Sequence, residues 1–201
     1  EGGMGQSIMT KDTPPSETAK FTLLPVAKVL LPDGSREVVP GSGEVGMVAQ
    51  GGMVPLGYYK DPEKSAKTFK EIDGTRYAFI GDMATIDADG TINLLGRGSN
   101  CINTGGEKVF PEEVEEALKL HPDVADALVF GLEDERFGNR VAGVVSLEQG
   151  GTAEAGDILE ATRKLLASYK LPKDLLVVPV VPRAPNGKAD YKSAKALMAD
   201  S

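Results

Sequence analysis

The first half of the chain alternates short apolar runs with glycine-containing turns, a pattern typical of short β-strands. The lead-in, residues 1–20, lacks apolar periodicity and is predicted to be loop. The Asp-Gly pairs at 33–34 and 89–90 are predicted to be turns, and residues 63–70 a short charged helix. Strands are predicted over residues 21–31, 36–39, 46–50, 76–86 and 91–95.

After residue 98 the pattern changes, because strands now alternate with amphipathic helices. One predicted helix begins at Pro111, carries two glutamates near the positive end of its dipole and places Val114, Ala117 and Leu118 on one face. The second half is predicted to contain helices over residues 111–120, 153–169 and 191–199, and strands over residues 124–130, 141–147 and 174–181.

This change of pattern predicts two parts joined at residues 96–99. Residues 1–97 are predicted to be β-rich, and residues 98–201 to form a compact α+β domain. The fold class predicted for the whole chain is therefore α+β.

Composition narrows the class of protein. Hydrophobic residues make up 41% of the 201 residues, and no apolar run approaches the roughly 20 residues of a membrane helix, so neither a membrane span nor wholesale disorder is expected. The net charge of −8 disfavours nucleic acid as a partner, since a polyanion binds a basic face. A single cysteine, Cys101, excludes an internal disulfide and favours a cytoplasmic location. Because the chain starts at Glu1 without Met or a signal peptide, we expect it to be part of a longer protein.

Two residues with reactive side chains have ordinary interpretations. His121 is the sole histidine, at the end of a predicted helix, where we expect it to interact with the last helix carbonyls. Histidine-based triads and metal clusters are excluded. Cys101 is expected to be a small buried hydrophobe rather than a nucleophile.

Three short motifs are weak when each is taken alone. Residues 87–90 resemble the start of a calcium loop, but apolar residues stand at the later ligand positions, so a hairpin turn is predicted. The glycine-containing segment 103–108 lacks the Lys-Ser/Thr pair and the following helix of a P-loop, so its spacing favours a plain glycine turn. Asn186-Gly187 predicts a turn in which Lys188 would be a solvated turn lysine.

Four blocks in order along the chain resemble the adenylate-forming superfamily of acyl-CoA synthetases, nonribosomal adenylation domains and beetle luciferases. They are 43–62, running from GEVG to GYYKDP, 77–82, which reads YAFIGD, 96–115, which reads GRGSNCINTGGEKVFPEEVE, and 185–188, which reads PNGK. Their order over most of the chain is far more specific than any single block.

The resemblance implies a particular architecture. In that superfamily a large N-terminal part ends in a β-barrel subdomain, and a mobile α+β domain follows a hinge. Residues 1–97 would then be the β-rich end of the barrel subdomain, and residues 98–201 the mobile C-terminal domain. The phosphate loop and the acyl pocket would belong to an N-terminal part of the same enzyme that lies upstream. Glu1 would be the glutamate that helps to hold Mg²⁺.

The resemblance also implies roles for individual residues in binding ATP and AMP. Asp82 would accept hydrogen bonds from the two ribose hydroxyls, as an ionised carboxylate with two oxygens can. Arg97 would offer its planar donor fork to nucleotide oxygens. Lys188 would be catalytic, bridging the carboxylate substrate and the α-phosphate.

A second half-reaction would use CoA. The loop of Gly105, Gly106 and Glu107 would move to the site, since glycine lets backbone pass close to the thin pantetheine arm. Rotation of the C-terminal domain would withdraw Lys188 at the same time. Ser99 would be the pivot, although many members carry Asp or Lys at this position.

The predicted function is therefore the C-terminal portion of an ATP-dependent acyl-CoA synthetase, most similar to actinobacterial fatty-acyl and steroid side-chain CoA synthetases. Its substrates would be a small-molecule carboxylate, ATP and CoA, and the chain by itself is expected to be inactive. One alternative is an adenylation module that loads a carrier protein. Another is a non-catalytic α+β interaction domain in which Lys188, Asp82 and Arg97 are ordinary surface residues.

Overall fold

The computed structural model describes residues 5–6 and 19–199, which divide into two compact units. Unit 1 ends at Ser99 and unit 2 begins at Asn100. None of the helices in the described residues is long and apolar enough to cross a membrane.

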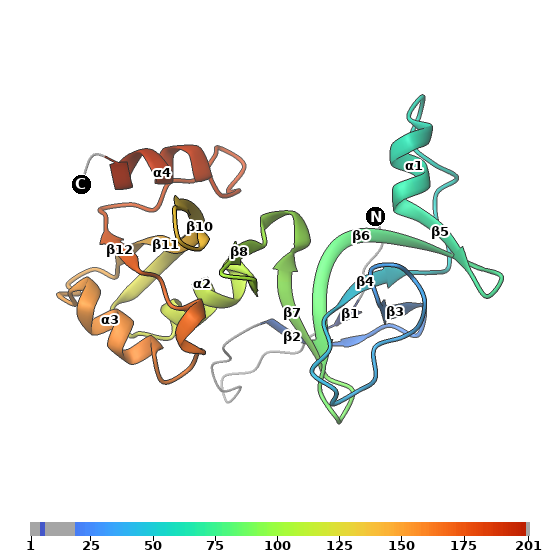
Figure 1. Cartoon of the computed structure of the whole chain (residues 1–201), viewed down its shortest axis with the longest axis horizontal. Helices are drawn as coiled ribbons and strands as arrows, with labels where there is room; N and C mark the ends of the chain where they lie inside the picture. Colours follow the sequence, from blue (N-terminus) through green and yellow to red (C-terminus); the bar gives the residue numbers. More distant parts are fainter. Residues whose placement is uncertain (1–4, 7–18, 200–201) are drawn as a thin grey trace. The chain divides into compact units, whose positions relative to one another are not determined.

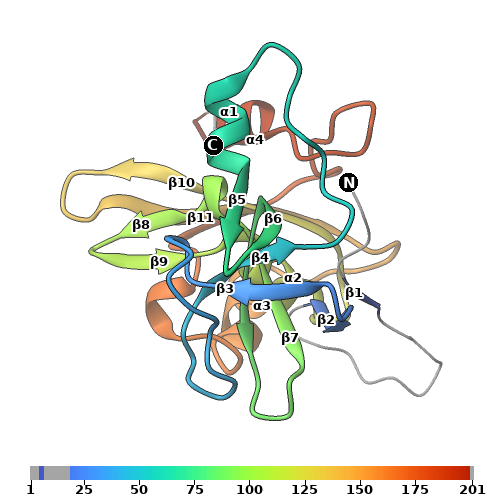
Figure 2. The same ribbon diagram turned by 90° about the vertical axis from the view of Figure 1, so that its right-hand side faces the viewer.

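Unit 1 is built on a seven-stranded sheet in which every pairing is antiparallel. The strand order is β1-β2-β7-β6-β4-β3, with β5 paired to β6, and α1 leads directly into β5 (Figure 2). The elements are β1 (Gly5–Gln6), β2 (Ala19–Leu23), β3 (Ala27–Leu30), β4 (Gly46–Gln50), α1 (Pro62–Thr68), β5 (Phe69–Ile72), β6 (Thr75–Ile86) and β7 (Ile92–Arg97).

The long strand β6 organises this sheet, because β4, β5 and β7 all pair with it. Its register shifts at Met83/Ala84 against β7, and β4 shifts at Met47/Ala49 against β6. An extra residue at such a bulge bends a strand, and Figure 1 shows β6 curving along its length. The curved sheet encloses a core that includes Val29, Val48, Ala84 and Ile92.

Two predictions in unit 1 were wrong in detail. The predicted strand 21–31 is broken by a turn in which the Ala27 amide donates to the Leu24 carbonyl (2.9 Å), so β2 and β3 are separate strands. Residues 36–39 form only an isolated bridge to Leu30, because their neighbours are turn residues. The short helix is confirmed as α1, although it ends at Thr68.

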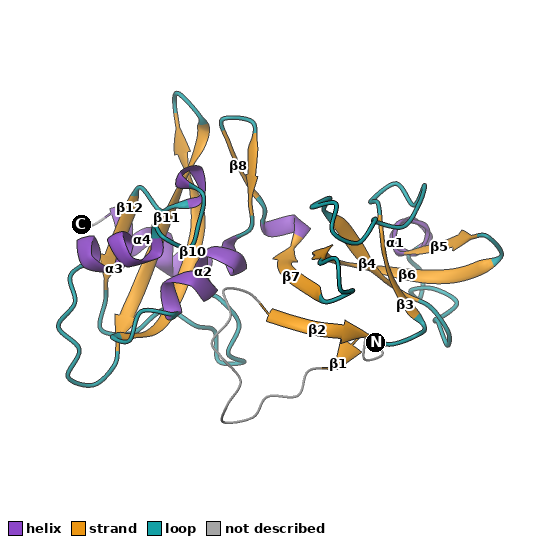
Figure 3. Ribbon diagram, turned by 90° about the horizontal axis from the view of Figure 1, so that it is seen from below, coloured by secondary structure: helices purple, strands orange, loops and turns teal. Residues whose placement is uncertain are grey.

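Unit 2 combines a five-stranded sheet with three helices (Figure 3). The strand order is β10-β11-β8-β9, and β12 pairs with β11 in parallel. The elements are β8 (Ile102–Thr104), β9 (Glu107–Val109), α2 (Pro111–Lys119), β10 (Val124–Asp134), β11 (Gly138–Leu147), α3 (Ala155–Thr162), β12 (Asp174–Val177) and α4 (Tyr191–Ala199), with short 3₁₀ turns at Gly98–Asn100 and Ser168–Lys170.

Helices cover both faces of this sheet (Figure 1). On one face, α2 and α3 supply Val114, Leu118 and Ile158 to a core cluster that includes Val129 of β10 and Val145 of β11. On the other face, α4 packs Ala194 against the alternate residues of the same strands, which are Leu128, Phe130, Ala142 and Val144. This alternation follows from the two-residue side-chain period of a strand. The predicted α+β class and the predicted helix face of α2 are confirmed.

Two predictions in unit 2 were also wrong in extent. The helix predicted over 153–169 ends at Thr162, whose hydroxyl donates to the Ile158 carbonyl (2.8 Å) inside the core. Beyond Thr162 the Lys164 and Leu165 amides donate to the Ala161 and Thr162 carbonyls (3.4 Å and 2.9 Å), three residues back, so a turn replaces the α-helix. The strand predicted over 174–181 is only four residues long and half-buried, and Pro179, which has no amide hydrogen, follows it closely.

Candidate functional site

Asp82 and Arg97 are brought together by strand register. They face each other as direct partners on β6 and β7, and Arg97 Nε lies 2.8 Å from Asp82 Oδ1. Arg97 Nη1 also donates to the Ile80 carbonyl (3.0 Å). Because antiparallel partners are fixed by the ladder, the sheet itself sets the separation of these two side chains.

The two side chains differ in exposure, which suits them to different contacts. The Asp82 side chain is 16% exposed, whereas that of Arg97 is 55% exposed. An ionised carboxylate only accepts hydrogen bonds, at about four lone-pair sites, whereas a guanidinium only donates them. Arg97 retains guanidinium surface that solvent or a ligand can reach. The pair can therefore bind a group that both donates and accepts hydrogen bonds.

Gly105 and Gly106 form the two-residue turn of the β8–β9 hairpin. Thr104 and Glu107 are the last paired residues, and the two glycines have φ of +59° and +90°. Two successive positive φ values are typical of a tight two-residue hairpin turn, and residues with a Cβ rarely adopt such φ values. The glycine turn that spacing predicted is confirmed.

The surroundings of the two glycines differ. The Gly105 amide donates to the Phe137 carbonyl (3.0 Å), and a Cβ at Gly105 would lie 3.1 Å from the Phe137 ring. A Cβ at Gly106 would meet no atom within 4 Å. Gly105 is thus packed against the β10–β11 turn, whereas Gly106 and the exposed Glu107 present an open edge.

Lys188 lies on a turn of its own in unit 2, between β12 and α4. Its amide donates to Asn186 Oδ1 (3.2 Å) and its carbonyl accepts from the Ala184 amide (2.8 Å). The Gly187 amide donates to the Ala184 carbonyl (2.8 Å) with φ of +79°, which a glycine tolerates. The turn predicted from Asn186-Gly187 is confirmed, and the Lys188 side chain is exposed at its end.

Comparison with known proteins gives a consistent answer. The family model described as the AMP-binding enzyme C-terminal domain matches residues 113–188. A 3-oxocholest-4-en-26-oate–CoA ligase of Rhodococcus rhodochrous is 47% identical over 96% of this chain and 34% of its own length. A medium/long-chain-fatty-acid–CoA/3-oxocholest-4-en-26-oate–CoA ligase of Mycolicibacterium smegmatis is 52% identical over 83% of this chain and 30% of its own length. The chain belongs to the adenylate-forming superfamily.

Solved structures with a similar fold agree with this assignment. Apo MatB from Rhodopseudomonas palustris superposes with a TM-score of 0.74 at 30% identity, over 98% of this chain and 38% of that protein. The ATP-bound form of MatB matches with a TM-score of 0.70 at 31% identity, over 89% of this chain and 34% of that protein. The chain spans about a third of the length of the curated relatives and of these structures, and corresponds to their C-terminal region.

Three other candidates from the sequence carry no site here. Glu1, the predicted magnesium ligand, lies outside the described residues, and residues 5–6 and 19–199 hold no group of three or more His, Cys, Asp or Glu suited to a metal ion. Burial raises the pKa of the Cys101 thiol, which disfavours the reactive thiolate. The prediction for His121 was wrong, because its Nδ1 accepts the Asp123 amide hydrogen (3.2 Å) instead of facing the helix carbonyls.

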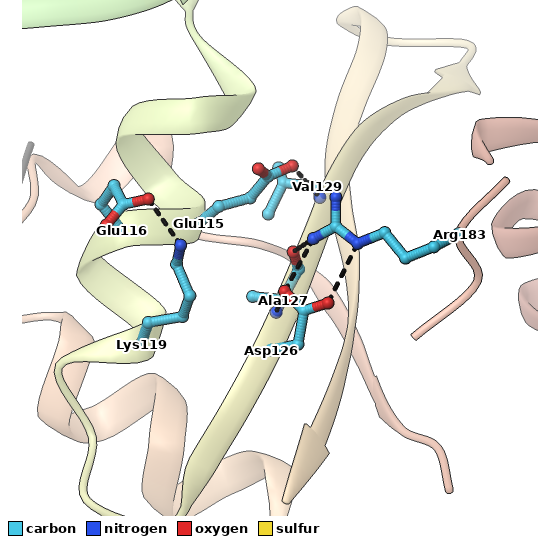
Figure 4. Close-up of polar contacts among 7 residues, drawn as sticks. All are labelled: Glu115, Glu116, Lys119, Asp126, Ala127, Val129 and Arg183. Carbon is cyan, nitrogen blue, oxygen red and sulfur yellow. Dashed lines mark hydrogen bonds and ion pairs between the residues drawn. The ribbon is translucent and has the colours of Figure 1, made fainter. Parts of the chain in front are cut away.

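One polar cluster beside the Lys188 turn was missed by the sequence analysis (Figure 4). Arg183 forms an ion pair with Asp126 of β10, and Glu115 of α2 accepts the Val129 amide hydrogen (2.8 Å). Burial raises the pKa of Glu115 to about 7, against the lowering effects of that hydrogen bond and of Arg183. The helical period gave no signal for this cluster, since Glu115 falls outside the apolar face of α2 formed by Val114, Ala117 and Leu118.

Proposed function

We propose that this chain forms the C-terminal part of an ATP-dependent acyl-CoA ligase that acts on medium- to long-chain fatty acids or on the carboxylated side chain of a steroid. The observation that carries the proposal is the 47% identity, over 96% of the chain, to a ligase with a steroid acid named as its substrate. In the first half-reaction a carboxylate and ATP would give acyl-adenylate and pyrophosphate. In the second, CoA would give the thioester and AMP.

Asp82 and Arg97 would fix the nucleotide. The Asp82 carboxylate would accept hydrogen bonds from the ribose hydroxyls, and the exposed Arg97 fork would donate to nucleotide oxygens. Neither side chain would exchange a proton. Their contribution would be orientation, which lowers the entropic part of the barrier.

Lys188 would act in the adenylation step. A carboxylate oxygen attacks the α-phosphorus, and the bond from that phosphorus to the bridging oxygen of pyrophosphate breaks. The Lys188 ammonium would donate hydrogen bonds to the carboxylate and to an α-phosphate oxygen, where negative charge accumulates. Its exposed position on a tight turn supports this role, because an ammonium on a four-carbon stem can reach beyond the surface of unit 2.

The β8–β9 turn would act in the thioester step. The CoA sulfur attacks the acyl carbon, and the bond from that carbon to the AMP oxygen breaks. The open space beside Gly106 supports a passage for the narrow pantetheine arm, and Glu107 would border it. We propose that unit 2 reorients about Ser99 between the two steps, which would withdraw Lys188 and present this turn.

Magnesium would be held in part by Glu1 together with residues of the N-terminal part of the ligase. None of the roles given above to Asp82, Arg97, Lys188 or the glycine turn requires a metal contact from the described residues.

The test compares the chain with the whole ligase. The 201-residue chain should give no carboxylate-dependent exchange of pyrophosphate into ATP, because the acyl pocket and phosphate loop would lie in the N-terminal part. The whole ligase should convert a medium-chain fatty acid, ATP and CoA to acyl-CoA and AMP, measured by mass spectrometry. Exchange by the isolated chain would contradict the assignment to a C-terminal part. Transfer of the acyl group to a carrier protein but not to CoA would contradict the ligase.

A further inference from the structure

The Lys188 turn, residues 183–189, is closed at its tip by backbone hydrogen bonds, and at its base the side chain of Arg183 contacts strand β10. At the tip, the Ala184 amide bonds to the Lys188 carbonyl (2.8 Å). At the base, Arg183 and Ala189 form an antiparallel bridge, and the Asp190 amide donates to the Pro182 carbonyl (3.2 Å). The turn therefore behaves as a small hairpin whose orientation depends on what holds its base.

Arg183 holds that base on strand β10. Its Nη2 and Nε lie 2.7 Å and 3.0 Å from the two carboxylate oxygens of Asp126, and Nη2 also donates to the Ala127 carbonyl (3.3 Å). A guanidinium that engages both oxygens of a carboxylate fixes direction as well as distance. About a third of each side chain is exposed, 34% for Arg183 and 33% for Asp126, so the contact is partly shielded from solvent.

Asp126 is itself held in place. Its Oδ1 accepts the Ala127 amide hydrogen (2.8 Å), and it lies beside the register shift between Val124 and Asp126 in the β10–β11 ladder. A bulge of this kind re-aims a side chain relative to a regular strand. The hydrogen bond from the Ala127 amide therefore helps to hold the carboxylate toward Arg183, and Figure 4 shows the contacts among these three residues.

Glu115 adds a second acidic group near the same guanidinium. It projects from α2 on the side of β10 where Arg183 lies (Figure 4), and its Oε1 accepts the Val129 amide hydrogen. Arg183 lowers the pKa of Glu115, and both Asp126 and Glu115 raise the pKa of Arg183. Arg183 is thus in direct contact with Asp126 of the strand, and Glu115 of the helix acts on it only through its electrostatic field.

We propose that Arg183 is a positioning residue for Lys188, and that its two-point contact with Asp126 sets the position from which the Lys188 ammonium serves adenylation. This inference rests on the proposed function. Arg183 would touch neither ATP nor the acyl group. It would act through the Ala184–Lys188 hydrogen bond, which couples the arm that Arg183 anchors to the residue that reaches the reaction centre.

The expected consequence is specific to one half-reaction. Without the anchor, the turn can pivot on its two arms, and a displacement of about 1 Å is enough to cost a positioned catalytic group up to about a hundredfold in rate. Adenylation uses Lys188, whereas thioester formation does not. Loss of the anchor should therefore lower the kcat of adenylation and leave both the KM for ATP and the thioester step unchanged.

Two substitutions remove the anchor from opposite sides. Arg183→Met keeps an unbranched side chain of similar length and removes the guanidinium, and Asp126→Asn keeps an acceptor for the Ala127 amide while it removes the negative charge. Arg183→Lys retains the charge without the planar fork. Arg163→Met is the matched control, because Arg163 is 64% exposed and pairs only with Glu160 of its own helical segment among the ion pairs of the described residues.

The first measurement is hydrogen exchange of the Ala184 and Gly187 amides in the 201-residue chain. We expect exchange roughly tenfold faster in Arg183→Met and Asp126→Asn, an intermediate rate in Arg183→Lys and no change in Arg163→Met, because an amide in a loosened turn opens more often. Unchanged exchange in both anchor variants would overturn the proposal.

The second measurement separates the half-reactions in the whole ligase. We expect the kcat of adenylation to fall between about tenfold and about a hundredfold in both anchor variants, with partial recovery in Arg183→Lys and normal thioester formation from supplied acyl-adenylate. If the wild-type ligase adenylates normally and Arg183→Met does also, the positioning role is wrong and the proposed function stands. If the wild-type ligase forms no acyl-adenylate, the proposed function is wrong and the catalytic role of this anchor falls with it.

Discussion

The Asp82–Arg97 pair and the Lys188 turn are held by different kinds of structure. Asp82 and Arg97 are cross-strand partners, so the backbone ladder of β6 and β7 sets their separation. Lys188 stands at the end of a turn, and its local hydrogen bonds fix the shape of the turn but not its direction. At its base the turn is held by several contacts: the packing of Val181 and Ala189 on the core of unit 2, and the ion pair of Arg183 with Asp126, to which we assign the direction of Lys188.

This difference matches the roles proposed for the two regions. A nucleotide clamp serves best if it does not move, and a ladder of several hydrogen bonds resists distortion by any single substitution. A lysine that is needed in one step and withdrawn in the next serves best on a small element with its own anchor. Substitutions far from the reacting atoms should therefore disturb Lys188 more readily than Asp82.

The largest effect is expected at Lys188. Lys188→Ala in the whole ligase should lower the rate of adenylate formation by about a thousandfold, because it removes the positive charge that stabilises the transition state. Thioester formation from supplied acyl-adenylate should persist. The two rates are measured separately, by pyrophosphate release and by appearance of acyl-CoA.

Lys192→Ala is the matched control for that substitution, since Lys192 is an exposed lysine four residues further along, in the first turn of α4. It should leave both rates unchanged. An equal loss of both half-reactions in Lys188→Ala would contradict the role given to this lysine.

The second effect concerns the glycine turn. Gly106→Val should slow thioester formation by roughly a hundredfold, because a branched side chain would fill the open edge where the pantetheine arm would pass, and it should slow adenylation much less. The positive φ of 90° will also cost about 1–2 kcal/mol of folding stability.

Gly150→Val separates strain from obstruction. Gly150 has φ of +89° and equally open surroundings. It lies beyond the C-terminal end of β11, whereas β8 pairs with β11 at its N-terminal end, at Gly138. It should lower the melting temperature to the same degree and spare thioester formation. A defect of Gly106→Val that is confined to adenylation would rule out the assignment of this turn to CoA.

The third effect tests the nucleotide clamp. Asp82→Asn removes the negative charge that would accept ribose hydroxyls and that pairs with Arg97, so the KM for ATP should rise roughly tenfold to thirtyfold. Asp89→Asn, in the hairpin turn that joins β6 and β7, is the control and should leave KM unchanged. Titration of ATP at a saturating acid concentration distinguishes them, and an unchanged KM in Asp82→Asn would remove Asp82 from the nucleotide site.

The sequence predicted the parts of this molecule that depend on local chemistry. The turns at Asp89-Gly90, Gly105-Gly106 and Asn186-Gly187 are confirmed because their residue types determine their backbone conformation. Membership of the superfamily, which was predicted from the order of four motifs, is confirmed by the comparisons with known proteins. The helix expected to run to residue 169 stops at Thr162, where the Lys164 and Leu165 amides donate to carbonyls three residues back instead of four, a change that apolar spacing does not reveal.

The cluster around Arg183 was missed for a different reason. Arg183 meets Asp126 across 57 residues of sequence, and Glu115 lies on a third element. A single sequence contains no signal for a contact between residues so far apart. Each residue alone is an ordinary charged position, and only the packed structure shows that Arg183 pairs with Asp126 and lies within electrostatic range of Glu115.

The smallest expected effect concerns Glu115. It tests the side-chain cluster around Arg183, which has no counterpart in the strand pairing that holds Asp82 and Arg97. Burial raises the pKa of Glu115 to about 7, and the negative charge of Glu112 raises it further. The groups that lower the pKa of Glu115 are the Val129 amide, Arg183 and Lys119. Tyr191 of α4 also lies within electrostatic range of Glu115. The pKa of this carboxyl is near 4.5 in the unfolded chain and about 7 in the folded one, so the folded state holds the Glu115 proton more tightly. The free energy of unfolding that this proton contributes is therefore lost as the pH rises from about 4.5 through about 7. Glu115→Gln keeps an acceptor for the Val129 amide and cannot ionise. The free energy of unfolding of the 201-residue chain, measured in denaturant from about pH 5 to about pH 8, should therefore fall by about 1–2 kcal/mol more in the wild type than in Glu115→Gln. Parallel curves for the two proteins would show that the Glu115 carboxyl is ionised throughout this range and that Arg183 neutralises it fully.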